Sequence, residues 1–196
     1  APDPWRVTLT DAAGATVLRE HPGLGAGPSG TLGFRVAGGW FHAARVVSGG
    51  QVGGAFEADL ETTDPTRGIH VRLAPSGEGL VNLKASVTGN TAGVTAIGMG
   101  FDTQAGERYL GFGERSNAVD QRGNEVETYV SDGPYEAEDR PIVQAFVPPV
   151  GFRPRDDSTY FPMPWLLSTA GYGVLMHNTE TSYHRLGSSD AGAWSL

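Results

Sequence analysis

Acidic side chains are concentrated between positions 102 and 157 of this 196-residue chain. Paired carboxyl groups can hydrolyse glycosidic bonds when one is protonated, the other is ionised and the two lie about 5–10 Å apart. The sequence alone does not pair any two of these groups, and most of them fit a solvated surface. The candidates are Asp102, Glu107, Glu114, Asp120, Glu125, Glu127, Asp132, Glu136, Glu138, Asp139, Asp156 and Asp157.

Asp132 differs from the other carboxylates because aromatic and turn-forming residues surround it, in the segment YVSDGPY at 129–135. Carbohydrate sites combine a carboxylate, which accepts hydrogen bonds from hydroxyl groups, with aromatic rings that cover C–H surfaces. An Asx turn that only holds the loop explains the same residues. The residues by themselves leave a sugar-binding role and a turn-forming role open for Asp132.

Other chemistries have weaker support. The chain has no cysteine, which excludes thiol catalysis and cysteine-based zinc sites. Its histidines lack the spacing of metal ligands, and His42 and His70 lie in strand patterns that indicate structural roles. Residues 25–30 match GxGxxG, but Pro28 removes an amide and a strand pattern follows, so we interpret this segment as a flexible loop. No GxSxG motif is present. We expect no metal and no cofactor.

The composition limits the classes of partner. The formal net charge of −8 argues against nucleic acid and against an anionic membrane surface, because both require a basic patch. No apolar run reaches the roughly 18 residues of a membrane span. The chain opens at Ala1 without an initiator Met, which favours an exported bacterial protein over a cytoplasmic one and leaves the compartment undecided.

Alternation of apolar and polar residues predicts an all-β fold, an antiparallel β-sandwich that forms a single domain over residues 1–196. The first two strands should form a hairpin, and 134–140 has room for one short helical turn. The expected strands are 6–10, 15–19, 31–36, 40–47, 51–61, 68–73, 80–88 and 91–101.

The sequence changes in character near residue 107, where a loop-rich C-terminal half begins. It contains long irregular stretches at 118–127 and 131–159. Loops of this length are usually functional or interfacial, and we expect 131–159 to be the least ordered part of the isolated domain.

Two blocks in this half resemble glycoside hydrolase family 31. The first is YLGFGER at 109–115, followed by Asn117 and by DQRG at 120–123. The second is YFPMPWLLS at 160–168, followed by GYGV at 171–174 and by Asn178. Both blocks are similar to signatures of the N-terminal β-sandwich that precedes the catalytic barrel in that family. We expect the second block to be a core strand pair in which either the set with Trp165 or the set with Leu166 faces the interior.

The resemblance implies a galactose-mutarotase-like β-sandwich that packs on a (β/α)8 barrel in a retaining α-glycosidase. The family's catalytic aspartates lie in the barrel, so the resemblance implies no catalytic residue within this chain. The loop after the RG segment reaches the substrate in the family, and the matching residue is Asp132. Trp165-Leu166 departs from the usual aromatic pair, and sulfoquinovosidase-like members also have enlarged loops here, so the sugar stays open.

Two other functions remain as alternatives. A free-standing carbohydrate-binding module would bind an α-glycoside on a shallow aromatic platform and would need no partner domain. A sugar mutarotase shares the sandwich but requires a His and Glu acid/base pair in a central cleft, which the histidines here support poorly.

Overall fold

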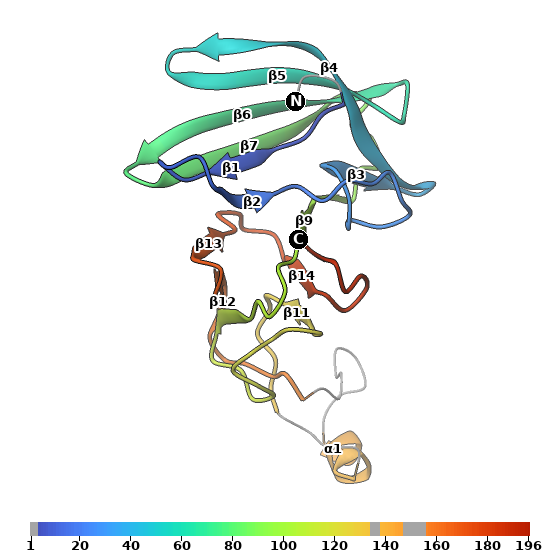
Figure 1. Ribbon diagram of the computed structural model, residues 1–196. Coiled ribbons are helices and arrows are strands. Elements are labelled where there is room, and N and C mark those ends of the chain that lie inside the picture. Colours follow the sequence, from blue (N-terminus) through green and yellow to red (C-terminus); the bar gives the residue numbers. More distant parts are fainter. Residues whose placement is uncertain (1–3, 134–137, 147–155) are drawn as a thin grey trace. The chain divides into compact units, whose positions relative to one another are not determined.

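The computed structural model describes residues 4–133, 138–146 and 156–196. It divides into two compact units, Ala1–Asp102 with Gly192–Leu196 and Thr103–Ala191. Strands dominate both units and pair antiparallel, which confirms the all-β prediction (Figure 1). Within the described residues the structure has one helix, α1 (Arg140–Phe146). The boundary between the units lies close to the change in sequence character near residue 107.

The first unit is built on a six-stranded antiparallel sheet with the strand order β7-β6-β5-β4-β3-β8. Its central strands follow one another along the chain and are joined by short turns, a meander that the alternating pattern predicts. The bounds are β3 (Gly33–Val36), β4 (Gly39–Val52), β5 (Ala55–Thr62), β6 (Arg67–Gly77), β7 (Leu80–Gly89) and β8 (Ala96–Gly98).

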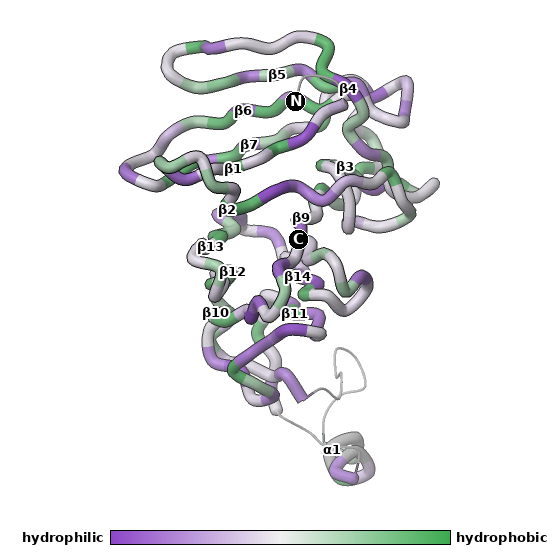
Figure 2. The backbone as a smooth tube through the Cα atoms, viewed as in Figure 1, coloured by the Kyte–Doolittle hydropathy of each residue, from purple (hydrophilic) through white to green (hydrophobic). Residues whose placement is uncertain are grey.

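Alternation along these strands gives the sheet one apolar and one polar face, because successive side chains of a strand point to opposite sides. On β5 and β6 the side chains of Leu60, Ile69 and Val71 are buried, whereas Asp59 and Glu61, which flank Leu60 on β5, are exposed. Figure 2 shows hydrophobic and hydrophilic residues along the same strands. The buried face forms much of the unit's core.

A short hairpin and a pair of strands, one of them at the C-terminal end of the chain, complete the first unit. β1 (Thr8–Thr10) pairs with β2 (Thr16–Arg19), which confirms the predicted hairpin. β9 (Gly100–Asp102) pairs with β15 (Ala193–Ser195), and the rings of Phe101 and Trp194 stack at 4.6 Å. The fully buried Glu20 accepts hydrogen bonds from two backbone N–H groups, at 2.7 and 2.6 Å.

The second unit contains two smaller sets of strands. β10 (Tyr109–Gly113), β12 (Pro162–Ser168) and β13 (Tyr172–Leu175) form a three-stranded antiparallel sheet. β11 (Glu125–Glu127) pairs with β14 (Tyr183–Leu186). The fully buried side chains here are Tyr109, Phe112, Gln121, Val126, Leu166, His184 and Leu186.

Several predicted strands differ from the observed ones. The expected strand 51–61 is wrong at its start, because β4 continues to Val52 and a turn precedes β5. The expected strand 91–101 is two short strands, β8 and β9, which pair with different partners. Gly98 and Gly100 flank this break, and a Cβ atom at either position would lie 2.5 or 2.7 Å from a backbone atom of another segment.

The second signature block forms the predicted strand pair, with Trp165 opposite Leu175. The set that faces inward contains Leu166, which is fully buried, whereas Trp165 is only partly buried and Leu167 is exposed. The short turn expected at 134–140 falls partly on 134–137, outside the described residues, and α1 begins at Arg140 instead. Residues 134–137 and 147–155 of the 131–159 loop lie outside the described residues, so the expectation that this loop is the least ordered part stays a prediction.

Candidate functional site

The long loop between β11 and β12 is closed at its base by a small antiparallel bridge between Ser131 and Thr159. Each residue donates its backbone N–H to the carbonyl oxygen of the other, at 2.9 and 3.1 Å. Asp132 follows Ser131 on the incoming arm, and Tyr160 follows Thr159 on the outgoing arm. The bridge therefore fixes the place from which both side chains extend.

Asp132 and Tyr160 contact each other across the bridge. The Tyr160 hydroxyl donates a hydrogen bond to Oδ1 of Asp132, and the Gly133 N–H donates to the same oxygen at 3.1 Å. This contact raises the pKa of Tyr160 above its usual value, because the hydroxyl proton is held by a carboxylate. Both side chains are exposed. The pair is a charged acceptor beside an aromatic ring, which are the two elements of a sugar contact.

Asp132 cannot form the standard hydrogen bond of an Asx turn. An Asx turn needs the N–H group two residues after the aspartate, and position 134 is a proline, which has no N–H. The observed local bond goes to the next residue, Gly133. The proline therefore excludes the standard Asx-turn bond, and a role in holding the loop through Gly133 and Tyr160 stays open beside the sugar contact.

Arg115, the last residue of the first signature block, ties the two arms of this loop to β10. Its Nε donates to the Phe112 carbonyl at 3.2 Å, Nη2 to the Glu127 carbonyl at 2.9 Å and Nη1 to the Asp157 carbonyl at 3.2 Å. The Asp157 carboxylate lies 3.8 Å from Nη1, and the Arg115 side chain is only 2% exposed. A nearly buried guanidinium thus joins three segments of the second unit.

Further hydrogen bonds hold each arm separately. On the outgoing arm, Ser116 Oγ donates to the Asp156 carbonyl and lies 3.2 Å from Ser158 Oγ. On the incoming arm, the Thr128 N–H donates to the Ser182 carbonyl at 2.9 Å, and the two hydroxyl groups are 2.6 Å apart. These contacts lie within the second unit and fix the residues on either side of the bridge.

The GFG part of the signature is a backbone feature. Gly111, Phe112 and Gly113 all have positive φ angles, of 100°, 67° and 81°. A Cβ atom would lie 2.2 Å from a backbone oxygen at Gly111 and 1.8 Å at Gly113, so only glycine fits either position. This unusual run turns the Phe112 ring into the core, where it is fully buried against the His184 ring at 5.0 Å.

The remaining signature residues also make contacts inside the unit. Gln121 is buried and exchanges hydrogen bonds with Asn117, at 3.0 and 3.2 Å. Asp120 accepts the backbone N–H of Tyr109 at 3.1 Å, and Arg122 donates to the Glu107 carbonyl at 2.5 Å. These bonds give this part of the signature a structural role within the second unit.

Glu107 is a buried carboxylate whose partners are tyrosine and serine hydroxyls. Its Oε1 accepts hydrogen bonds from Ser168 at 2.5 Å and from Tyr172 at 2.6 Å, while Oε2 accepts the Gln104 N–H at 2.7 Å. Burial raises the pKa of Tyr172 well above its usual value, and its bond to Glu107 adds to the shift. Through these bonds Glu107 links the residues before β10 to β12 and β13, which indicates a structural role.

His184 is fully buried, and neither of its ring nitrogens has a hydrogen-bond partner. Burial lowers its pKa to about 4, and the nearby positive charge of Arg115 acts in the same direction. Its ring meets the edge of Phe112 instead of a polar group. The neutral form therefore predominates in the folded state near neutral pH.

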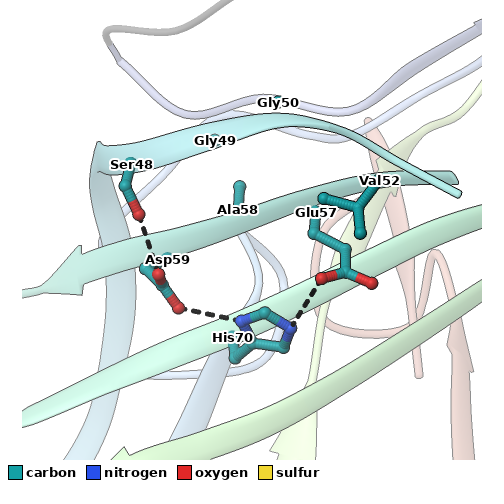
Figure 3. Close-up of a pocket in the computed structure, with 8 residues that line it drawn as sticks. All are labelled: Ser48, Gly49, Gly50, Val52, Glu57, Ala58, Asp59 and His70. Carbon is teal, nitrogen blue, oxygen red and sulfur yellow. Dashed lines mark hydrogen bonds and ion pairs between the residues drawn. The ribbon is translucent and has the colours of Figure 1, made fainter.

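A second group of polar side chains lies on the exposed face of the first unit's sheet, around a hollow of about 250 Å³ (Figure 3). His70 Nδ1 lies 2.8 Å from Asp59 and its Nε2 lies 4.0 Å from Glu57. Ser48 donates to Asp59 at 2.8 Å, and Arg72 Nε to Glu57 at 2.9 Å. The hydrogen bond from His70 lowers the pKa of Asp59.

This cluster was missed in the sequence, which indicated only a structural role for His70. The signal was the cross-strand register, because Ser48, Asp59 and His70 stand opposite one another on β4, β5 and β6. Its charges pair with each other at the surface, as cross-strand pairs commonly do. The His and Glu types of a mutarotase site are present, but on an open sheet face.

Several of the acidic candidates from the sequence have partners within the described part of the chain. Asp132 stands with Tyr160, Asp157 with Arg115, and Glu107 with its hydroxyl partners, whereas Asp102 pairs with His21 and Arg19 in the first unit. Among the described residues there is no group of three or more side chains that could hold a metal ion. No helix in this part of the chain is long and apolar enough to cross a membrane.

The loop base and its signature residues match a known family. Residues 2–184 match the glycosyl hydrolase 31 N-terminal galactose mutarotase-like domain. The chain belongs to this family. The match covers most of both structural units, and the predicted family is confirmed.

Relatives in sequence and structure agree with this family. An isomaltosyltransferase from Sporosarcina globispora is 31% identical over 86 residues, which are 44% of this chain and 6% of that protein. A family 31 sulfoquinovosidase from E. rectale, solved with an aza-sugar inhibitor, has a TM-score of 0.67 at 12% identity and covers all of this chain. The cycloalternan-forming enzyme of Listeria monocytogenes, solved with a pentasaccharide substrate, has a TM-score of 0.54 at 16% identity over 84% of this chain.

These relatives are much longer than the chain described here. The match spans 29% of the sulfoquinovosidase and 19% of the cycloalternan-forming enzyme. At these identities the structural likeness establishes the fold alone.

Proposed function

We propose that this chain is the non-catalytic N-terminal domain of a retaining α-glycoside hydrolase, and that the catalytic (β/α)8 barrel belongs to the same protein. The family match over residues 2–184 supports this proposal, as does the small share that the chain occupies in its longer relatives. The alternative of a free-standing carbohydrate-binding module has no comparable support.

Asp132 is the residue that would contact the substrate. The observation that carries this role is its exposed carboxylate at the bridged base of the loop, paired with the Tyr160 hydroxyl. A carboxylate held in this way can accept hydrogen bonds from sugar hydroxyls, while the ring of Tyr160 offers an apolar face to C–H groups. Asp132 would then form part of the pocket wall, and the nucleophile and acid would come from the barrel.

A face of the second unit is suited to contact with the barrel. On the outward side of β12 and the residue before it, Phe161, Met163 and Leu167 are exposed, at 71%, 54% and 41%. Trp165 lies between them in the same alternating set, opposite the exposed Leu175. An apolar stripe of this kind is costly in water and marks a docking surface. We assign it to the barrel of the same protein.

The test of the Asp132 role is steady-state kinetics of Asp132→Asn in the full-length enzyme on an α-glycoside. Asparagine keeps Oδ1 for the Gly133 and Tyr160 contacts and removes the negative charge. A charged acceptor contributes about 1.5–3 kcal/mol, so kcat/KM should fall about 10- to 150-fold. The loss should be far smaller than that of a missing nucleophile.

The matched control is Asp156→Asn, which neutralises another exposed aspartate at the same loop base. It should change kcat/KM by less than about 2-fold. Unchanged kcat/KM in a folded Asp132→Asn enzyme would refute substrate contact by Asp132. The isolated 196-residue chain should lack glycosidase activity, and turnover of a nitrophenyl α-glucoside at an ordinary enzymatic rate would overturn the non-catalytic assignment.

A further inference from the structure

We propose that Arg115 is a positioning residue for the reaction, which acts by holding Asp132 in place for its contact with the sugar. This inference rests on the proposed function of Asp132 and extends it to a residue that cannot reach the substrate itself, because its side chain is 2% exposed. It also gives the arginine of the GFGER block a function beyond packing.

The contacts of Arg115 reach the loop from both sides. The Glu127 carbonyl, which accepts from Nη2 at 2.9 Å, lies on the incoming arm five residues before Asp132. The Asp157 carbonyl, which accepts from Nη1 at 3.2 Å, lies on the outgoing arm three residues before Tyr160. Because Tyr160 in turn holds Asp132, the guanidinium restrains both halves of the pair.

The third contact fixes the guanidinium itself. Its Nε donates at 3.2 Å to the carbonyl of Phe112, whose backbone has a φ angle of 67° and whose side chain is fully buried. The flanking glycines allow this conformation and no other residue fits there. Arg115 therefore connects the base of the loop to a buried residue of the core, Phe112.

Arginine is required for this geometry because its planar fork offers five N–H donors in fixed directions. Lysine would keep the charge and three N–H donors, but all three are on one nitrogen, whereas the three carbonyls here are bonded by three different nitrogens of the guanidinium. A displacement of about 1 Å at a contact residue can cost up to about 100-fold in rate. The loss that acts through Asp132 cannot exceed the loss caused by Asp132→Asn.

The experiment is a double-mutant cycle of Arg115→Lys and Asp132→Asn in the full-length enzyme, with kcat and KM measured separately for each variant. We expect Arg115→Lys alone to lower kcat/KM by more than about 3-fold. In the Asp132→Asn background the same change should cost less than about 2-fold, because the contact it protects is already gone. A merely structural role predicts the same loss in both backgrounds.

Arg122→Lys is the matched control, because Arg122 also donates to two backbone carbonyls, those of Glu107 and Gln104, away from the loop arms. Its loss should be equal in both backgrounds. If Arg115→Lys fails to fold, Ser116→Ala replaces it in the cycle, since Ser116 holds the outgoing arm through Asp156 and Ser158. It should show the same non-additivity.

The outcomes separate the two proposals. Equal losses for Arg115→Lys, or for Ser116→Ala in its place, in both backgrounds overturn the positioning role and leave the Asp132 contact standing. Unchanged kcat/KM in Asp132→Asn overturns both. A loss that disappears in the Asp132→Asn background, with an additive Arg122→Lys control, supports the positioning role of Arg115.

Discussion

The burial of His184 makes the stability of the second unit depend on pH in a way that one substitution can isolate. The ring is fully buried with no hydrogen-bond partner, and its pKa falls to about 4 from the ordinary 6.5. In the unfolded chain the same histidine titrates near its ordinary value. Between these two pKa values the unfolded state binds a proton that the folded state does not.

The sign and size of the effect follow from this difference. The contribution of His184 to the free energy of unfolding is fully present above about pH 6.5, where the ring is neutral in both states. This contribution is lost as the pH falls towards 4. The shift of about 2.5 units corresponds to about 3 kcal/mol at 1.36 kcal/mol per unit. This is a large part of the 5–15 kcal/mol by which a domain is usually stable.

The assay is urea denaturation at several pH values between 7 and 4 for the wild type and for His184→Leu, which has a similar volume and no titrating group. The difference in the free energy of unfolding between the two proteins should change by about 3 kcal/mol over this range. The raised pKa of Glu20 works in the opposite direction, since its contribution is lost as pH rises, but it is present in both proteins and cancels.

The control is His177→Gln, which removes an exposed histidine of the same unit. It should leave the slope of stability against pH unchanged. A His184→Leu protein whose stability falls in parallel with the wild type between pH 6.5 and 4 would show that His184 is protonated in the fold, and the burial argument would fail.

Five further substitutions, at three places in the fold, test the packing. Glu20→Gln should destabilise by about 1–3 kcal/mol in urea, because one backbone N–H then faces an amide donor. Gly113→Ala should prevent folding or cost more than about 4 kcal/mol by thermal melting, whereas Gly123→Ala, also at positive φ but with open space, should cost about 1–2 kcal/mol. Leu166→Ala should cost about 2–5 kcal/mol and exposed Leu167→Ala less than about 1 kcal/mol, both measured by urea denaturation of the 196-residue chain.

Each of these three predictions has an outcome that would contradict it. A neutral Glu20→Gln would mean that its carboxyl group is protonated in the fold. Equal costs at Gly113 and Gly123 would show that steric contact adds nothing to backbone strain. A larger cost at Leu167 than at Leu166 would reverse the assignment of the inward face of β12.

The sequence was sufficient for the fold class and for the family. Regular alternation of apolar and polar residues predicts the meander of the first unit. The first signature block contains Gly111 and Gly113, which the backbone geometry requires to be glycine. The inward face of β12 was not predictable, because alternation assigns Trp165 and Leu166 to opposite faces without saying which one is buried. Burial of Leu166 depends on its neighbours in space.

The sequence also indicated a candidate site, and its contact with a sugar stays a prediction. The aromatic and turn-forming residues around Asp132 indicated a possible sugar contact. Pro134, which has no N–H, excluded the standard Asx-turn hydrogen bond. Its pairing with Tyr160 and the anchoring by Arg115 join residues far apart in sequence, so no local pattern contains them. The His70 cluster likewise depends on the register of three strands.

The bridge at the loop base has a consequence for how this domain can diversify. Asp132 and Tyr160 are 28 positions apart in the chain, yet they are neighbours because the bridge closes the loop. The entropy of closing a loop grows only with the logarithm of its length, so doubling the loop costs about 0.6 kcal/mol. Insertions between the arms therefore cost the domain little stability, and the loop can change in length while Asp132 and Tyr160 stay paired.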